Sequence, residues 1–401
     1  MNGGSPPTAP KARTGLFTPP GRVFFARANN LLDSDRGRLG MSGKEQYHGV
    51  KIRSTVRAQL TLCDICGAAN FKPWLEVSLC GVSNQWIHRC STCGFRQIRP
   101  RLAPEELSAL YPADYFDPAG WVGYHDYARE AQRRTRDAYF LARRMRGRVP
   151  NPRVLEVGCA LGFLLKGLQD AGCNVDGVDA SPFGVHYATT RFNLPVVCGT
   201  LEEACFPDES FDLVIQKDLL EHVLYPRQHL LETCRVMRKG AELWLVTPNG
   251  EANLRPLSAS RQVSDATQRD LPLLDQGHLS FFSQRHLRRL FTECGFTVSW
   301  ARTIGVRRGL RALGFLPGQQ RFIRRAARVD SSVSMSADRD SIGDHDFSGL
   351  AERIDTAIKE HHNFVRGWLP YYYIHRVGKT LDALPTSTAL GYDYEFLLRK
   401  D

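Results

Sequence analysis

The segment from Val154 to Leu165 constrains this 401-residue chain more than any other. Apolar residues at its start fit a short buried strand, and after Gly158 and Gly162 apolar residues recur at helical spacing. The two glycines allow a tight turn, and they let the backbone of that turn approach a ligand closely. The segment therefore predicts a strand, a tight loop and a helix, with a ligand at the loop.

A second short strand, Asn174–Asp179, follows this helix and ends in a carboxylate. Asp179 lies 21 residues after Gly158, about where a nucleotide-binding βαβ unit places the acid that binds ribose hydroxyls. A dinucleotide fingerprint needs a small residue where this chain has Phe163. The spacing thus predicts a ligand that carries a ribose and argues against a dinucleotide.

The loop resembles motif I of the class I S-adenosylmethionine (SAM) dependent methyltransferases. Glu156, Gly158 and Gly162 match its Glu-x-Gly-x-Gly-x-Gly pattern, and Ala160 replaces the middle glycine. The order of the downstream segments supports the resemblance, because a motif counts only in its structural context. The resemblance implies a Rossmann-like α/β fold with a seven-stranded sheet, and it implies SAM as cofactor. The implied cofactor-binding residues are Glu156, Gly158, Ala160, Gly162, Asp179, Ala180, Thr200, Leu201, Glu202, Gln216 and Lys217.

Two Cys-x-x-Cys pairs precede motif I: Cys63 with Cys66 and, after 23 further residues, Cys90 with Cys93. Two such knuckles are a strong zinc signature, because four thiolates complete a closed tetrahedral shell. A closed shell leaves no open position, so we expect structural Zn²⁺; paired buried thiols without a metal are the alternative. A zinc knuckle ahead of motif I resembles bacterial methyltransferases of secondary metabolism and glycan assembly, including sugar C-methyltransferases.

Residues Gln216–Val223, which follow the fourth expected strand of the sheet, carry most of the candidate chemistry. Methyl transfer from a sulfonium is an in-line displacement that needs a positioned acceptor and, for some acceptors, a base. His222 and His278 are the candidate catalytic bases, and each could instead only hold the structure by hydrogen bonds. Asp218, Glu221 and His222 also resemble the set that holds a divalent ion in ubiquinone-pathway O-methyltransferases, so Mg²⁺ is a less favoured alternative.

The chain is expected to divide into five parts. Its net charge of +11 is concentrated at the start, where residues 1–58 hold ten basic and three acidic residues without periodicity. At the other end, aromatic and charged residues alternate as in a strand, and we expect this strand at the edge of the sheet. The parts are a disordered basic tail (1–58), a zinc-binding segment (59–120), the SAM-binding core (121–304), a helical insertion (305–390) and the final strand of the core (391–401).

The pattern within the core gives four further expectations. The pattern predicts a helix over 229–237, a fifth strand over 242–246 and a polar insertion over 251–277 that would cover the acceptor. A charged helix over 125–148 is interpreted as having a solvated basic face.

The remaining expectations concern partners and location. Eleven cysteines without a signal-peptide pattern favour reduced thiols and the cytoplasm, and no apolar run is long enough for a transmembrane helix. We expect a small-molecule acceptor, such as a sugar nucleotide or a secondary metabolite, and leave the oligomeric state open. The alternative is a nucleic-acid-directed protein that uses the zinc segment and the basic tail. It is less favoured because the zinc segment lacks dense Lys and Arg with interleaved aromatics.

Overall fold

The structure is a computed structural model of the chain. It describes residues 62–79, 85–103, 106–107, 110–111, 115–117, 127–254, 273–274, 277–305, 347–367 and 392–401. The expected tail (1–58) lies outside the described residues, and so does most of the expected insertion (305–390). All described residues belong to one compact unit, Thr61–Asp401.

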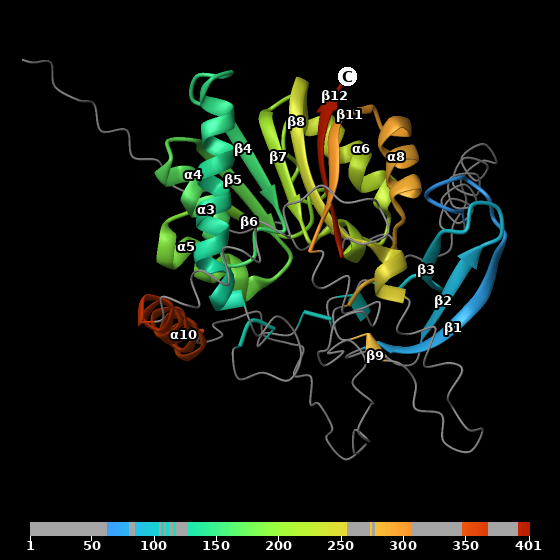
Figure 1. Cartoon of the computed structure of the whole chain (residues 1–401), viewed down its shortest axis with the longest axis horizontal. Coiled ribbons are helices and arrows are strands. Elements are labelled where there is room, and N and C mark those ends of the chain that lie inside the picture. The colour runs from blue at the N-terminus through green and yellow to red at the C-terminus, as the bar shows by residue number, and fades with distance from the viewer. Residues whose placement is uncertain are drawn as a thin grey trace, which may run out of the picture. The chain divides into compact units, whose positions relative to one another are not determined.

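A seven-stranded sheet forms the centre of this unit (Figure 1). Its strand order is β11-β12-β8-β7-β4-β5-β6, and β12 alone runs antiparallel to its neighbours. The order reverses between β4 and β7, which places ligands at the carboxyl ends of those strands. This topology confirms the predicted class I sheet. The bounds are β4 Arg153–Val157, β5 Asn174–Asp179, β6 Val196–Cys198, β7 Phe211–Lys217, β8 Met237–Pro248, β11 Phe296–Ile304 and β12 Asp393–Lys400.

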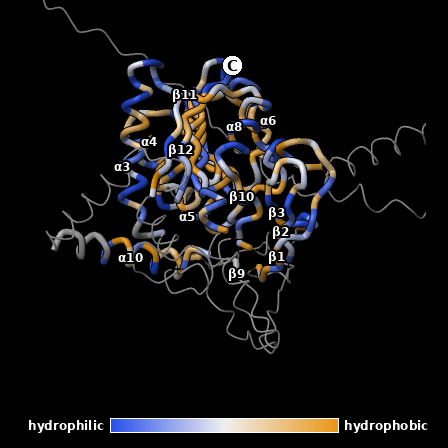
Figure 2. The backbone as a smooth tube through the Cα atoms, turned by 45° about the vertical axis from the view of Figure 1, so that its right-hand side comes forward, coloured by the Kyte–Doolittle hydropathy of each residue, from blue (hydrophilic) through white to orange (hydrophobic). Residues whose placement is uncertain are grey.

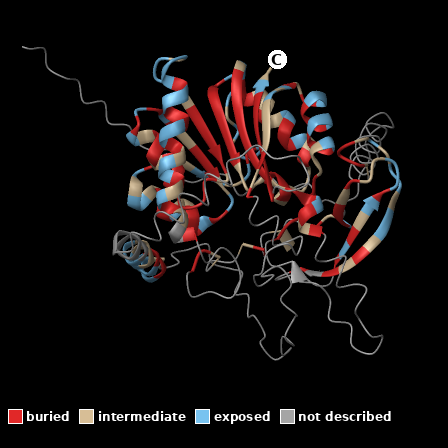
Figure 3. Ribbon diagram, in the orientation of Figure 1, coloured by how far each residue is buried: buried red, intermediate tan, exposed pale blue. Residues whose placement is uncertain are grey.

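Helices cover both faces of the sheet, and the strands between them are almost entirely buried (Figure 3). One face packs against α3 (Tyr127–Arg146), α4 (Phe163–Asp170) and α5 (Pro182–Phe192). The opposite face packs against α6 (Pro226–Val236) and α8 (Gln284–Glu293). Apolar residues concentrate on the strands and on the inner sides of these helices (Figure 2), as a layered α/β core requires.

Two boundaries differ from the sequence prediction. Helix α6 begins at Pro226, whose fixed φ suits the first helical position, and it ends at Val236. Strand β8 begins immediately at Met237, which pairs with Phe211 of β7, so the expected helix end and the expected short strand were both misplaced. Gly240 lies inside β8 with φ 72°. These bounds depend on the pairing of strands that are distant in sequence, and a local sequence pattern does not reveal that pairing.

The position of β12 is the larger correction. The strand lies between β8 and β11 and pairs with both along its whole length, so it is an interior strand and the edge assignment was wrong. An interior strand is covered on both sides, and six consecutive residues of β12, from Asp393 to Leu398, are buried accordingly.

The cysteine segment forms a second, smaller sheet. Strands β1 (Phe71–Leu79), β2 (Gln85–Cys90) and β3 (Arg96–Arg99) are antiparallel neighbours. Two short strands extend this sheet: β9 (Leu273–Leu274), from the region expected to cover the acceptor, pairs with β1, and β10 (Ser280–Phe281), which follows that region, pairs with β3. Cys63, Cys90 and Phe95 belong to the same apolar cluster as α6 and α8, so the segment packs directly on the methyltransferase-like core.

Helix α10 (Ser348–Gly367) is the described part of the expected helical insertion. It packs beside α3 and α5 through an apolar cluster that includes Leu350 and Ile354 (Figure 1). Tyr187 of α5 donates a hydrogen bond of 2.6 Å to Asp355, and Arg191 pairs with the same carboxylate at 2.9 Å. This part of the insertion therefore returns to the core.

Candidate active site

The loop after β4 has the left-handed backbone that its glycines allow. Gly158, Ala160 and Gly162 have φ of 75°, 51° and 78°. A Cβ at Gly162 would lie 2.8 Å from Leu194 Cδ1 and 3.0 Å from Ala188 Cβ, so this position requires glycine. Ala160, which replaces the middle glycine of motif I, also has a left-handed backbone conformation, and this costs about 1 kcal/mol for a residue with a Cβ. The loop thus keeps the motif I geometry although one glycine is replaced.

Asp179 holds this loop from the neighbouring strand. Its Oδ2 accepts a hydrogen bond of 2.7 Å from Ala160 N, and its Oδ1 accepts one of 2.8 Å from Ser181 N. Burial raises the pKa of Asp179, while these two N–H groups oppose that rise. Each carboxylate oxygen retains a free lone pair. The carboxylate therefore orders the loop and can still accept bonds from two ligand hydroxyls.

Glu156 is a buried acid below the loop, with only 1% of its surface exposed. Burial raises its pKa to about 8, and the charges of Arg134 and Lys217 act against this rise. Its Oε2 has no hydrogen-bond partner among the described residues. A buried acceptor of this kind fits a ligand that brings a donor, such as an ammonium group.

Arg134 is a buried charged residue near the loop and a candidate site residue that the sequence interpretation did not name. The basic residues of α3 were read as a solvated face, yet Arg134 is 3% exposed. Its guanidinium lies 4.6 Å from the Tyr127 ring centroid, and its Nε lies 3.3 Å from Glu130 Oε2. Arg134 follows Tyr127 by seven positions, so it shares the helix face of the apolar residues. That spacing could have identified it.

Gln216 and Lys217 end β7 and point to opposite faces, as successive strand residues do. Gln216 Nε2 donates 2.8 Å to Thr233 Oγ1 of α6, so this side chain faces a helix. Lys217 Nζ lies on the α3 side, 3.6 Å from Glu130 Oε2 and 3.7 Å from Asp218 Oδ2. Lys217 therefore joins Arg134 and Glu130 in a charged group at the carboxyl end of β7.

The residues predicted for adenine lie after β5 and β6. Leu201 is fully buried, and Ala180 is exposed next to Asp179. Glu202 Oε1 lies 3.2 Å from His229 Nδ1 of α6, which commits this side chain to the protein. Thr200 N donates 2.9 Å to Glu203 Oε2, which orders the turn. This arrangement leaves the backbone and Leu201 to contact a base.

The two candidate bases lie together although 56 positions separate them. The rings of His222 and His278 are 5.0 Å apart and nearly perpendicular, and Glu221 completes a group whose ligand atoms lie within 4.8 Å. His222 Nδ1 donates 3.2 Å to Gly277 O, so Nε2 carries the lone pair. Burial lowers the pKa of His222 to about 4 and that of His278 well below its usual value. Both imidazoles are therefore neutral near pH 7.

The alternative magnesium set is not assembled as proposed. The described group contains Glu221, His222 and His278, whereas Asp218 is directed to Lys217 and lies 3.9 Å from Arg134. Glu221 Oε2 accepts 2.8 Å from Thr247 Oγ1, and burial raises the pKa of Glu221 well above its usual value. The described group offers two imidazole nitrogens and one carboxylate, whereas Mg²⁺ prefers oxygen ligands.

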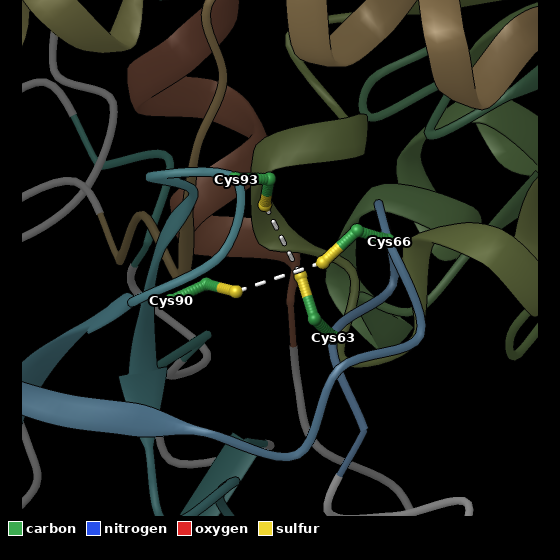
Figure 4. Close-up of side chains that lie close together, drawn as sticks. All are labelled: Cys63, Cys66, Cys90 and Cys93. Atoms are coloured by element: carbon green, nitrogen blue, oxygen red, sulfur yellow. Dashed lines mark hydrogen bonds between the residues drawn. The ribbon is translucent and has the colours of Figure 1, made fainter.

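The four predicted cysteines converge in space (Figure 4). Cys63 Sγ lies 3.6 Å from Cys93 Sγ, and Cys66 Sγ lies 3.6 Å from Cys90 Sγ. Tetrahedral zinc with Zn–S bonds of about 2.3 Å requires sulfurs roughly 3.8 Å apart. Helices α6 and α8 support the knuckles: Arg227 donates 2.7 Å to Asp64 O, and Arg285 donates 2.9 Å to Cys93 O. The donor set fits zinc.

Comparisons with known proteins agree with this geometry. Residues 124–299 match the sequence model of a family described as methyltransferase domain. A probable SAM-dependent methyltransferase of Mycolicibacterium smegmatis is 29% identical over 157 residues, 39% of this chain and 55% of that protein. A ubiquinone biosynthesis O-methyltransferase of Hahella chejuensis is 34% identical over 110 residues, 26% of this chain and 46% of that protein. The chain thus spans about half the length of these relatives.

Solved structures also resemble the chain. A SAM-dependent methyltransferase from Archaeoglobus fulgidus is 16% identical with a TM-score of 0.34, covering 66% of this chain and 94% of that one. The matched segment contains strands β4 to β8 and the start of β11, and β12 completes the sheet from outside it. Residues 124–299 therefore match the methyltransferase domain family, and the chain has the seven-stranded sheet of the class I SAM-dependent methyltransferase fold.

Proposed function

We propose that the chain transfers a methyl group from SAM to a small-molecule acceptor. The observation that carries this proposal is the Asp179 carboxylate, which is fixed 2.7 Å from the motif I backbone with lone pairs left for ribose hydroxyls. Glu156 would accept from the ammonium of the methionine part, and Arg134 and Lys217 would face its carboxylate. Leu201 would contact adenine.

SAM would supply an electrophilic methyl group on its sulfonium: the acceptor–carbon bond forms as the sulfur–carbon bond breaks, which leaves S-adenosylhomocysteine. The protein's part is to hold the acceptor in line and to remove its proton. His222 suits the second task because Gly277 fixes its tautomer and leaves the Nε2 lone pair available. His278 packs edge-on beside that ring and orients it.

The proposed acceptor class rests on the order of the zinc knuckle and motif I in the sequence, which resembles methyltransferases of secondary metabolism and glycan assembly. The ubiquinone biosynthesis and malonyl-acyl-carrier-protein O-methyltransferases are named for their own substrates. For this chain we propose a sugar nucleotide or a secondary metabolite, with a structural Zn²⁺ held by the four cysteines described above. We also propose a cytoplasmic location, because the sequence has eleven cysteines and no signal-peptide pattern. Among the described residues, no helix is long and apolar enough to cross a membrane.

Methyl-labelled SAM tests this proposal directly. The purified chain is incubated with labelled SAM and a cell extract that has been divided into metabolite and macromolecule fractions. We expect label in the metabolite fraction, and His222→Asn should lower its rate roughly a hundredfold if His222 is the base. Label that enters only RNA or DNA would contradict the proposed acceptor class, and no transfer in any fraction would contradict the activity.

A further inference from the structure

A cavity of about 590 Å³ lies between the cysteine segment and the start of α8. Apart from Cys93, none of the predicted site residues lines it. Its walls include Arg89, Arg96 and Arg285, and the one carboxylate among its described lining residues belongs to Glu251. The volume is in the range of small-molecule sites. The cavity is therefore strongly basic and large enough for a ligand.

Arg89 and Arg96 form an unusual pair in this wall. They lie directly opposite each other on β2 and β3, where like charges destabilise a sheet. The Arg96 guanidinium stacks 4.7 Å from the Trp74 ring centroid, and its Nε is buried without a hydrogen-bond partner among the described residues. The Arg89 guanidinium lies over Gly94, where an added Cβ would be 3.7 Å from Nη2. Within the described part of the chain, neither arginine has an acid within ion-pair distance.

The start of α8 adds a third positive element. Arg285 uses one N–H on Cys93 O and has further donors available. The helix begins here, so its dipole also favours an anion. His286 contributes shape without charge: its Nδ1 accepts from Ser283 N, its Nε2 donates 3.1 Å to Cys93 O, and burial lowers its pKa. Three guanidinium groups thus line this cavity. Among its described lining residues, only exposed Glu251 carries a negative charge that could compensate them.

We infer that this cavity binds the phosphate groups of a small ligand. A planar guanidinium group can donate two parallel hydrogen bonds to the oxygens of one phosphate. Two arginines on adjacent strands therefore suit a ligand with phosphate groups better than a ligand with a single carboxylate. A concave site of this volume favours a small ligand over a nucleic-acid backbone.

The wall of the cavity lies close along the chain to one candidate base, His278. Phe281 lies in its wall only three residues after His278, a length of chain that spans about 10 Å at most. An acceptor that carries a diphosphate could therefore bind its phosphates in the cavity and reach the histidines. This last step rests on the proposed function.

Inorganic pyrophosphate is the probe that tests the site. Its affinity for the full chain is measured by calorimetry for wild type, for Arg89→Gln with Arg96→Gln, and for the control Arg136→Gln with Arg288→Gln. The control removes the same charge from exposed arginines that do not line the cavity. We expect the cavity variant to bind roughly tenfold more weakly and the control to stay within about twofold of wild type.

Equal weakening in both double variants, or no binding to wild type, would overturn the inference. Arg89→Gln alone alters an exposed side chain and serves if the double variant does not fold; it should weaken binding about threefold. S-adenosylhomocysteine binding in the same samples should be unchanged, and it reports on the proposed function separately. Pyrophosphate that inhibits methyl transfer in wild type supports phosphate on the acceptor, whereas binding without inhibition overturns that step. Displacement of pyrophosphate by short single-stranded RNA would overturn the small-ligand class.

Discussion

Replacing Phe396 by alanine should strongly destabilise the domain. Phe396 is fully buried in β12, with its ring centroid 5.1 Å from that of Phe291 on α8. Truncation of a buried phenylalanine costs about 3–5 kcal/mol, because the lost contacts are compounded by the cavity left behind. For a domain of this size each kcal/mol lowers Tm by about 2–4 °C, so Tm should fall by roughly 10 °C.

Calorimetric unfolding measures this effect, with Arg399→Ala as the matched control. Arg399 is an exposed residue of the same strand, and its replacement should change stability by less than about 0.5 kcal/mol. Deletion of Tyr392–Asp401 should be far worse, since it bares the backbone donors and acceptors of both β8 and β11. A soluble truncated chain that binds S-adenosylhomocysteine, or a wild-type Tm for Phe396→Ala, would refute the interior position of β12.

Three further predictions concern the metal, the candidate base and the cofactor. Protein purified without a histidine tag should contain one Zn²⁺, and Cys90→Ser should lose it; zinc below about a tenth of an equivalent in wild type would rule out the site. His222 has a lowered folded pKa of about 4, so it contributes stability above pH 6.5 that is lost as pH falls toward 4. Relative to His222→Asn, the free energy of unfolding of wild type should fall by at most about 3 kcal/mol over that window. A stability difference between the two proteins that does not change with pH would contradict the buried neutral imidazole. Arg134→Gln should weaken S-adenosylhomocysteine binding roughly tenfold, whereas exposed Arg136→Gln should not; equal affinities would exclude Arg134 from the cofactor site.

Local spacing was enough to predict part of the site. The glycines of motif I require a left-handed backbone, and the turn that they form places Asp179 beside the loop. Each Cys-x-x-Cys pair is confined to one turn, and the pairing of Phe71 with Cys90 between β1 and β2 brings the two turns together. In both cases the spacing identifies the residues, because each group lies at the end of a short strand whose neighbour in the sheet is also near in sequence.

Other features depend on contacts between distant segments. His222 and His278 were each named singly, and a backbone hydrogen bond from Leu279 N to Glu221 O joins the distant segments that carry them. The interior place of β12 depends on a pairing between segments that are about 150 positions apart. Arg134 lies on a helix with many exposed arginines, and burial singles it out. Strand order and burial are global properties, and spacing along the chain does not specify them.

The central claim is that Asp179 binds the ribose of SAM, and a calorimetric cycle tests it. The affinities of wild type and Asp179→Ala are measured for S-adenosylhomocysteine and for its 2′,3′-dideoxy analogue, with Asp176→Ala of the same strand as control. Because the lost contact is made to the hydroxyls, Asp179→Ala should cost about 1.5–3 kcal/mol for S-adenosylhomocysteine beyond any loss for the analogue. Equal losses for both ligands, or no loss for either, would contradict the account.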